Sequence, residues 1–233
     1  MQTATQVAGA QLRTSASVCK AVRAVGIVKP KFNPQQKGFL PPSLEVKGSG
    51  FWLKQEHIFI TCAHVILELL GAPIELTGML VVGGNGAEYK KATITSIDYG
   101  HDLAVLEIDA DSAFIEAQSQ TGLDIVDRNI EVGERVSYAG FPFGNQLLNE
   151  RHSPTYAEGV VGSEIIESQG LKKIQVSGPI VGGYSGAPIV LQEDPSKVIA
   201  IVSHSPSKEA GDASIFMGIH WKHIRGISLL TNS

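Results

Sequence analysis

The sequence predicts a mostly β protein whose strands follow the pattern of barrels or sandwiches. Glycine accounts for 25 of 233 residues, more than the usual ~7%, and such a chain is rich in turns. Short runs of apolar and β-branched residues recur along the chain, with glycine or polar residues between them. This rhythm is typical of antiparallel β architectures and not of alternating strand–helix units.

In the first half, apolar runs and turn residues define the expected elements. Residues 1–17 are small and polar, and they are expected to form a flexible tail. An exposed, proline-containing loop is expected from Lys31 to Ser43, and Asn85-Gly86 is the tightest turn candidate. The predicted strands are Val18–Lys29, a hairpin over Gly48–Thr61 that feeds a short helical turn, Tyr89–Ile97 and Leu103–Ile108.

The second half repeats this pattern after a polar, acidic connection over residues 109–130. The apolar positions from His220 to Leu230 have helical spacing and predict a closing amphipathic helix. The predicted strands are Arg135–Ala139, Tyr156–Gly162, Lys173–Val176, Ala187–Leu191, Val198–Ser203 and Ser214–Ile219.

Composition narrows the classes of function and the compartment. The net charge is −4 and the pI about 6.0, so a nucleic-acid partner is not expected. No run of ~18 apolar residues predicts a membrane span. The two cysteines, Cys19 and Cys62, make no disulfide framework, and no signal peptide is evident. A reducing, cytoplasmic location is therefore expected. The alternative is an organelle after removal of a transit peptide, because the first 44 residues contain no Asp or Glu.

Three short segments carry residues suited to nucleophilic catalysis. Residues 60–65 read Ile-Thr-Cys-Ala-His-Val, residues 100–106 read Gly-His-Asp-Leu-Ala-Val-Leu, and residues 182–188 read Gly-Gly-Tyr-Ser-Gly-Ala-Pro. A serine hydroxyl is a weak nucleophile near neutral pH and needs an adjacent base, which a histidine supplies. The chain order is His64, Asp102, Ser185, one of the three orders known for such triads.

With two further segments, Gly48-Ser-Gly-Phe and Gly140-Phe-Pro-Phe-Gly, the chain resembles trypsin-like, chymotrypsin-fold serine peptidases. It is more similar to the compact, disulfide-free bacterial and organellar type, including HtrA-like domains, than to digestive trypsin. The resemblance implies two six-stranded antiparallel β-barrels with a short C-terminal helix. It places the first barrel at 18–118, with His64 and Asp102, and the second at 119–233, with Ser185. It implies an endopeptidase that needs no cofactor and no metal, acting on a peptide or protein substrate.

The resemblance also implies a role for each residue of the triad. Ser185 would attack the scissile carbonyl, His64 would accept and return the proton, and Asp102 would orient the imidazole. The backbone N–H groups of Gly183 and Ser185 would form the oxyanion hole. By the same resemblance, the substrate pocket would be lined by Pro179, Ile180, Val202, Ser203, His204, Ser205 and Met217.

Two departures from the family pattern bear on specificity and activation. Pro179 stands where trypsins carry an Asp, which predicts a small or medium apolar residue before the cut in place of Arg or Lys. Tyr184 replaces the Asp that pairs with a new N-terminus in zymogen-type relatives. Activation by N-terminal cleavage is therefore not expected, and the site is either constitutive or switched by a protein partner.

Three other interpretations remain open in the sequence. A nucleophile elbow of an α/β-hydrolase esterase would require a helix after Ser185 and a later histidine, whereas a strand-like Pro-Ile-Val-Leu run follows. A catalytically silent trypsin-like domain that binds peptides would keep the same motifs. His220 and His223 have a spacing that suits a metal, but no Cys or carboxylate lies near them in sequence.

Overall fold

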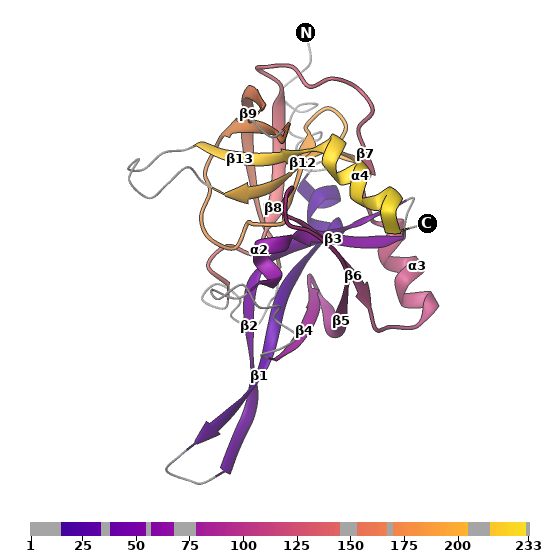
Figure 1. Cartoon of the computed structure of the whole chain (residues 1–233), viewed down its shortest axis with the longest axis vertical. Helices are drawn as coiled ribbons and strands as arrows, with labels where there is room; N and C mark the ends of the chain where they lie inside the picture. The colour runs from indigo at the N-terminus through magenta and orange to yellow at the C-terminus, as the bar shows by residue number, and fades with distance from the viewer. Residues whose placement is uncertain are drawn as a thin grey trace.

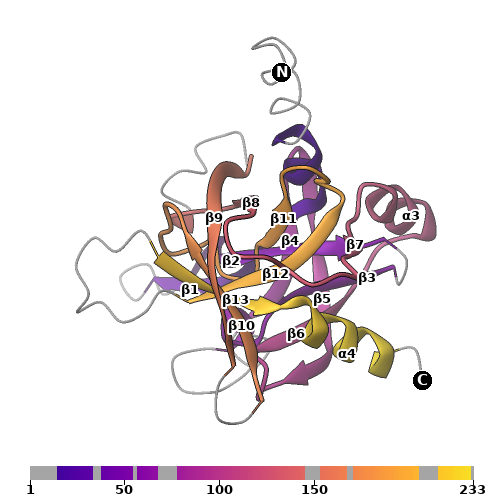
Figure 2. The same cartoon turned by 90° about the horizontal axis from the view of Figure 1, so that it is seen from above.

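The computed structural model describes residues 15–33, 38–54, 57–67, 78–144, 153–166, 170–204 and 215–231. Two β-barrels form the body of the molecule, and a C-terminal helix packs against strands of both (Figures 1 and 2). The predicted all-β fold of two antiparallel barrels with a closing helix is confirmed.

The first barrel closes through six antiparallel strands in the order β1-β2-β3-β6-β5-β4. Strand β1 pairs with both β2 and β4, which completes the ring. Beyond the barrel, β1 and β2 continue together as a long hairpin (Figure 1). The strands are β1 (Val22–Asn33), β2 (Gly38–Leu53), β3 (Ile58–Cys62), β4 (Met79–Gly84), β5 (Ala87–Asp98) and β6 (Leu103–Ile108).

The second barrel is a sheet in the order β11-β8-β9-β10-β13-β12-β7, closed by pairing of β11 with β12. Six of these strands make the barrel, and the short β7 joins β12 in parallel. The strands are β7 (Asp124–Ile125), β8 (Arg135–Gly140), β9 (Thr155–Ile166), β10 (Lys172–Ser177), β11 (Pro188–Leu191), β12 (Lys197–His204) and β13 (Ile215–His220).

Helices occur at the ends and junctions of the barrels. Residues 15–21 are helical, and α2 (Ala63–Ile66) is a single turn directly after β3. Helix α3 (Ser112–Gln120) begins at Asp111, whose carboxylate accepts a hydrogen bond from the Phe114 N–H. Helix α4 (Trp221–Thr231) buries Trp221, Ile224 and Ile227 at helical spacing. No helix within the described ranges has the length and apolar character needed to cross a bilayer.

Two interior clusters of apolar side chains stabilise the two barrels. The first centres on large buried residues such as Phe51, Phe59 and Leu103, and the second on Tyr138, Ile189 and Phe216. Full burial of one such side chain contributes about 1.5–3 kcal/mol. Both barrels are therefore rigid supports for the loops between their strands.

Two local predictions were wrong, and each has a physical reason. Residues 18–21 belong to a helix, and β1 begins only at Val22. The predicted loop from Lys31 to Ser43 is paired strand over residues 31–33 and 38–43. Pro41 and Pro42 fall at a register shift, opposite the step from Lys29 to Lys31, where no ladder N–H is needed. Residues 34–37 lie outside the described residues. The segment expected to connect the two halves, residues 109–130, also contains α3, a helix that its polar composition did not predict. Of the tail predicted over residues 1–17, residues 15–17 are helical, and residues 1–14 lie outside the described residues.

Candidate active site

The antiparallel register of β3 and β6 brings His64 and Asp102 together. Cys62, the last residue of β3, pairs with Leu103, the first residue of β6. The residues just beyond these ends, His64 and Asp102, must then be neighbours. The Ala63 N–H donates to the Asp102 carbonyl at 3.0 Å, which holds the end of β3 against the start of β6.

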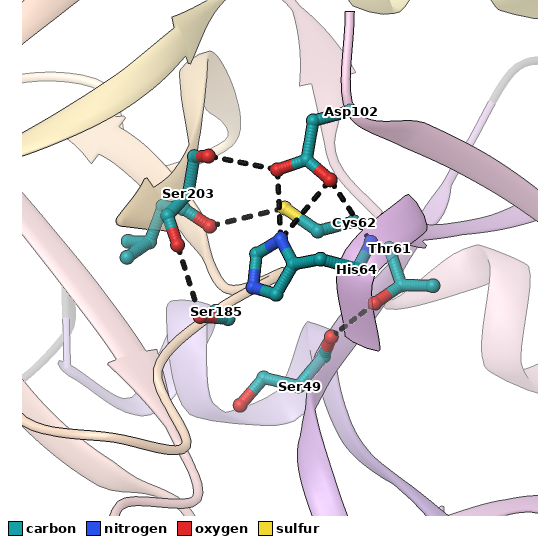
Figure 3. A network of polar contacts seen from close by, with 8 residues as sticks. Ser49, Thr61, Cys62, His64, Asp102, Ser185 and Ser203 are labelled. Atoms are coloured by element: carbon teal, nitrogen blue, oxygen red, sulfur yellow. Dashed lines mark hydrogen bonds and ion pairs between the residues drawn. The ribbon is translucent and has the colours of Figure 1, made fainter. Parts of the chain in front are cut away.

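His64 and Asp102 are joined through both side chain and backbone. His64 Nδ1 lies 2.8 Å from Asp102 Oδ2 and 3.0 Å from Oδ1, and the His64 N–H donates to Oδ1 at 2.9 Å. Since an ionised carboxylate only accepts, Nδ1 is the nitrogen that carries a proton here, and the lone pair of a neutral imidazole is then on Nε2. Figure 3 shows the imidazole between Asp102 and Ser185.

Asp102 has an unusual backbone conformation that the preceding turn supports. Its φ is +56°, a region that costs a non-glycine residue free energy. The Asp98 carboxylate, four residues earlier, accepts from the His101 N–H at 3.0 Å and bonds His101 Nδ1 at 2.6 Å. The His101 ring stacks on His223 of α4, with centroids 4.1 Å apart. The turn that carries Asp102 is thus attached to the C-terminal helix.

The Asp102 carboxylate stays ionised because its partners outweigh its burial. Burial alone would raise the pKa of Asp102, but hydrogen bonds from His64 and Ser203 hold this pKa below its usual range. Ser203 Oγ donates to Asp102 Oδ2 at 2.8 Å. The first barrel therefore supplies the His–Asp pair, and β12 of the second barrel stabilises it.

Ser185 lies in the loop between β10 and β11, beside the end of β12. The Gly186 N–H donates to the Val202 carbonyl at 2.8 Å, which fixes the loop against β12. The Ser185 hydroxyl donates to the Ser203 carbonyl at 2.9 Å, and no hydrogen bond joins it to the described His64 side chain. Ser203 therefore contacts Asp102 through its hydroxyl and Ser185 through its backbone (Figure 3).

The loop before Ser185 adopts a conformation that glycine alone permits at position 183. Gly183 has φ +103°, and a Cβ there would lie 2.2 Å from the Phe141 carbonyl oxygen. The Gly182 carbonyl accepts from the Phe143 N–H at 2.8 Å. Because the peptide is trans, the Gly183 N–H points away from Phe143. Within the described part of the chain, neither the Gly183 nor the Ser185 N–H has a backbone acceptor.

The residue before Ser185 is held by packing and not by an ion pair. The Tyr184 side chain is buried and meets Tyr138 edge-to-face, with centroids 5.4 Å apart. Burial raises the pKa of Tyr184 to about 12, so the phenol is neutral. Tyr138 in turn donates to the Pro179 carbonyl.

Cys62 brings a third potential ligand atom next to His64 and Asp102. The relevant atoms of these three residues lie within 4.8 Å of one another, a spacing that suits a metal ion. The Cys62 side chain is fully buried, however, and its thiol donates to the Val202 carbonyl at 3.2 Å. Burial raises the pKa of this thiol well above its ordinary value, and the negative charge of Asp102 is the second largest cause of the rise. In these contacts Cys62 behaves as a small buried side chain of the core.

The residues predicted to line a substrate pocket are spread over three segments. Pro179 is exposed, Ile180 packs at the edge of the second core, and Met217 is half-buried beside His204 in the β12–β13 ladder. The Val202 side chain is fully buried in the second core, so Val202 offers only its backbone here. The His204 side chain and all of Ser205 lie outside the described residues.

The two histidines considered for a metal site have other partners. His220 is buried, and its Nδ1 accepts from the Lys222 N–H at 3.2 Å. His223 Nε2 accepts from the Lys172 N–H at 2.8 Å. Each ring therefore has a nitrogen already bonded to the backbone.

Sequence reasoning missed Ser49, the residue that joins the Gly183 loop to the turn at Phe141. Its side chain is fully buried in β2, yet it contacts both the Gly183 loop and the Phe141 turn. The available signal was the Gly48-Ser-Gly-Phe segment, which was used for the resemblance without a role for its serine.

Two barrels with histidine, aspartate and serine at their junction define the class of trypsin-like peptidases. The chain matches the trypsin-like peptidase domain over residues 48–201, and it belongs to that family. A solved HtrA-type protease, AlgW with decapeptide, superposes with a TM-score of 0.75 over 95% of this chain and 67% of that chain. The identity is 18%, so this likeness shows the fold. No curated protein sequence matches significantly.

Proposed function

We propose that the chain is a serine endopeptidase that hydrolyses peptide bonds through an acyl-enzyme, with His64, Asp102 and Ser185 as its triad. The observation that carries this proposal is the His64 imidazole, bonded to Asp102 through Nδ1 and with Ser185 on its other side (Figure 3). In this arrangement the unprotonated Nε2 is the base available to the serine hydroxyl.

The proposed reaction has two symmetric halves. The Ser185 hydroxyl turns from the Ser203 carbonyl to His64, and its oxygen attacks the substrate carbonyl while Nε2 takes its proton. The imidazolium then gives that proton to the leaving amine, and the C–N bond breaks. A water repeats the sequence on the acyl-enzyme and restores Ser185. The N–H groups of Gly183 and Ser185 would bind the oxyanion in both halves.

We further propose that the enzyme is not activated by N-terminal cleavage. Tyr184 cannot pair with an N-terminal amine, and its packing against Tyr138 already holds the residue before Ser185. The Gly182 carbonyl is bonded to Phe143, which leaves the Gly183 N–H directed away from that turn. These contacts support a site that assembles without an activating protein partner. Activation by such a partner is the alternative proposal.

For specificity we propose a small or medium apolar residue before the cut. Pro179 offers no carboxylate for Arg or Lys, and Ile180 and Met217 are apolar and half-buried. Strand β12 pairs with β13 through His204, but its pairing with β11 covers only Val198–Ile201. A substrate strand would therefore add beyond that stretch.

Hydrolysis of a peptide library tests the proposal. Cleavage fragments identified by mass spectrometry should appear with the wild type and disappear with Ser185→Ala. Cleavage mainly after Arg or Lys would contradict the specificity. Fragments that persist in the variant would contradict the triad.

A second candidate function is a peptide-binding domain without catalysis. The bond from the Ser185 hydroxyl to the Ser203 carbonyl favours it, since that hydroxyl does not engage His64 in the free protein. Library peptides that bind without being cleaved would support this second function.

A further inference from the structure

Ser49 of the first barrel bonds to the loop that carries Ser185 at two points, the Gly183 and Ser185 carbonyls. Its side chain is fully buried. Resting on the proposed function above, we propose that Ser49 is a positioning residue that fixes the direction of the Gly183 N–H. It would act through the oxyanion loop and not by touching substrate.

The first contact concerns the peptide that follows Gly183. Ser49 Oγ donates to the Gly183 carbonyl at 2.7 Å. A carbonyl held in this way fixes the rotation of the Gly183–Tyr184 peptide, and therefore ψ of Gly183. No side chain restrains Gly183 itself, so an outside partner must supply this restraint.

The second contact concerns the peptide that precedes Gly183. The Gly182 carbonyl accepts from Phe143, in a turn whose Phe141 N–H donates to Ser49 Oγ at 3.0 Å. The Ser49 hydroxyl thus accepts from the turn that holds the Gly182–Gly183 peptide, and it donates to the carbonyl of the Gly183–Tyr184 peptide. Both restraints on the Gly183 N–H depend on one oxygen atom.

The Ser49 backbone is itself fixed, so its hydroxyl is a stationary support. Its N–H donates to the Ser185 carbonyl at 2.8 Å, and its carbonyl accepts from Thr61 Oγ1 at 2.6 Å. A Cβ at Gly186 would lie 2.0 Å from the Ser49 carbonyl oxygen, and one at Gly140 would lie 2.8 Å from Ser49 Oγ. These close approaches show that the neighbouring glycines let the chain pack tightly around Ser49.

Ser49→Ala removes the hydroxyl while leaving the backbone bond to Ser185 available. It leaves the Gly183 carbonyl and the Phe141 N–H without their partner. We expect kcat to fall by roughly 10- to 100-fold with KM changed less than about threefold, because an oxyanion donor acts in the transition state. Ser49→Cys, with a weaker donor of similar shape, should lose less of kcat than the alanine variant.

The matched control is Ser137→Ala in β8. Ser137 is equally buried, and its hydroxyl bonds the Tyr156 hydroxyl at 2.9 Å, away from the Gly183 loop. This control should keep kcat within about threefold of the wild type. A similar loss of kcat in both alanine variants would overturn the proposal, as would a rise in KM alone. A cysteine variant as impaired as the alanine variant would also count against it.

Crystal structures of the wild type and Ser49→Ala separate this inference from the proposed function. The wild type should show the Gly182 carbonyl on the Phe143 N–H, and the variant should show that peptide rotated or in two conformations. An unchanged peptide in the variant overturns the role of Ser49, whatever the activity. If Ser49→Ala does not fold, the same comparison is made with Ser49→Cys. A wild type without hydrolysis overturns the proposed function, while the two structures still decide the role of Ser49.

Discussion

Adding one methyl group at Gly183 should abolish most activity, while the same change at Gly182 should not. A Cβ at Gly183 would lie 2.2 Å from the Phe141 carbonyl oxygen, whereas ordinary contacts begin near 3.4 Å. The loop must therefore shift by roughly 1 Å, which turns a hydrogen bond of about 2.9 Å into a contact too long to count as one. Loss of one oxyanion donor lowers kcat by about 10²–10³, or about 2.7–4 kcal/mol.

The adjacent glycine is a control of the same chemistry. At Gly182 an added Cβ meets nothing within 4 Å, and its φ is not in the positive range. Steady-state kinetics on a cleaved library peptide should show the large fall in kcat only for Gly183→Ala, with KM little changed. Thermal unfolding would confirm that both variants are folded. Equal kcat values for the two variants would refute the role given to the Gly183 N–H.

Three more predictions follow from the hydrogen bonds and burial of the site. Asp102→Asn should lower kcat by about 10⁴, because it presents the wrong partner to His64 Nδ1; a loss below tenfold would contradict this. Ser203→Ala should lower kcat about tenfold, since a hydrogen bond to a charged group contributes about 1.5–3 kcal/mol and this carboxylate is partly exposed; unchanged kinetics would count against it. Burial lowers the pKa of His220 to about 4, so the folded state resists its protonation and stability should fall between pH 6.5 and 4. Measured by urea unfolding, the free energy of unfolding should fall between these pH values by about 3 kcal/mol less in His220→Asn than in the wild type. An identical pH dependence in the two proteins would contradict this.

The sequence was informative about the fold where strands alternate or repeat apolar residues. The runs at Leu103–Ile108 and Val198–Ser203 are confirmed as β6 and β12. The sequence was misleading where the local composition did not indicate the backbone conformation. Pro41 and Pro42 indicated a loop, but a register shift admits them into β2. Helix α3 depends on a cap at Asp111 within a polar segment that carries no strong period.

The candidate site shows the same division between local and long-range information. Short motifs were enough to predict that His64, Asp102 and Ser185 belong together. The partners of these residues come from segments far apart in sequence, and no local pattern contains that information. Ser49 lies 134 residues from Gly183, and the hydrogen bond between them exists only once the two barrels have docked. The orientation of the Ser185 hydroxyl toward Ser203 is likewise a property of the folded cleft.

Labelling by a fluorophosphonate probe, read as the intact mass of the protein, tests the central claim most directly. The account predicts one adduct on the wild type, located at Ser185, and none on Ser185→Ala or His64→Ala. A folded wild type that remains unlabelled, or an adduct that persists in Ser185→Ala, would contradict the assignment of Ser185 as a nucleophile activated by His64.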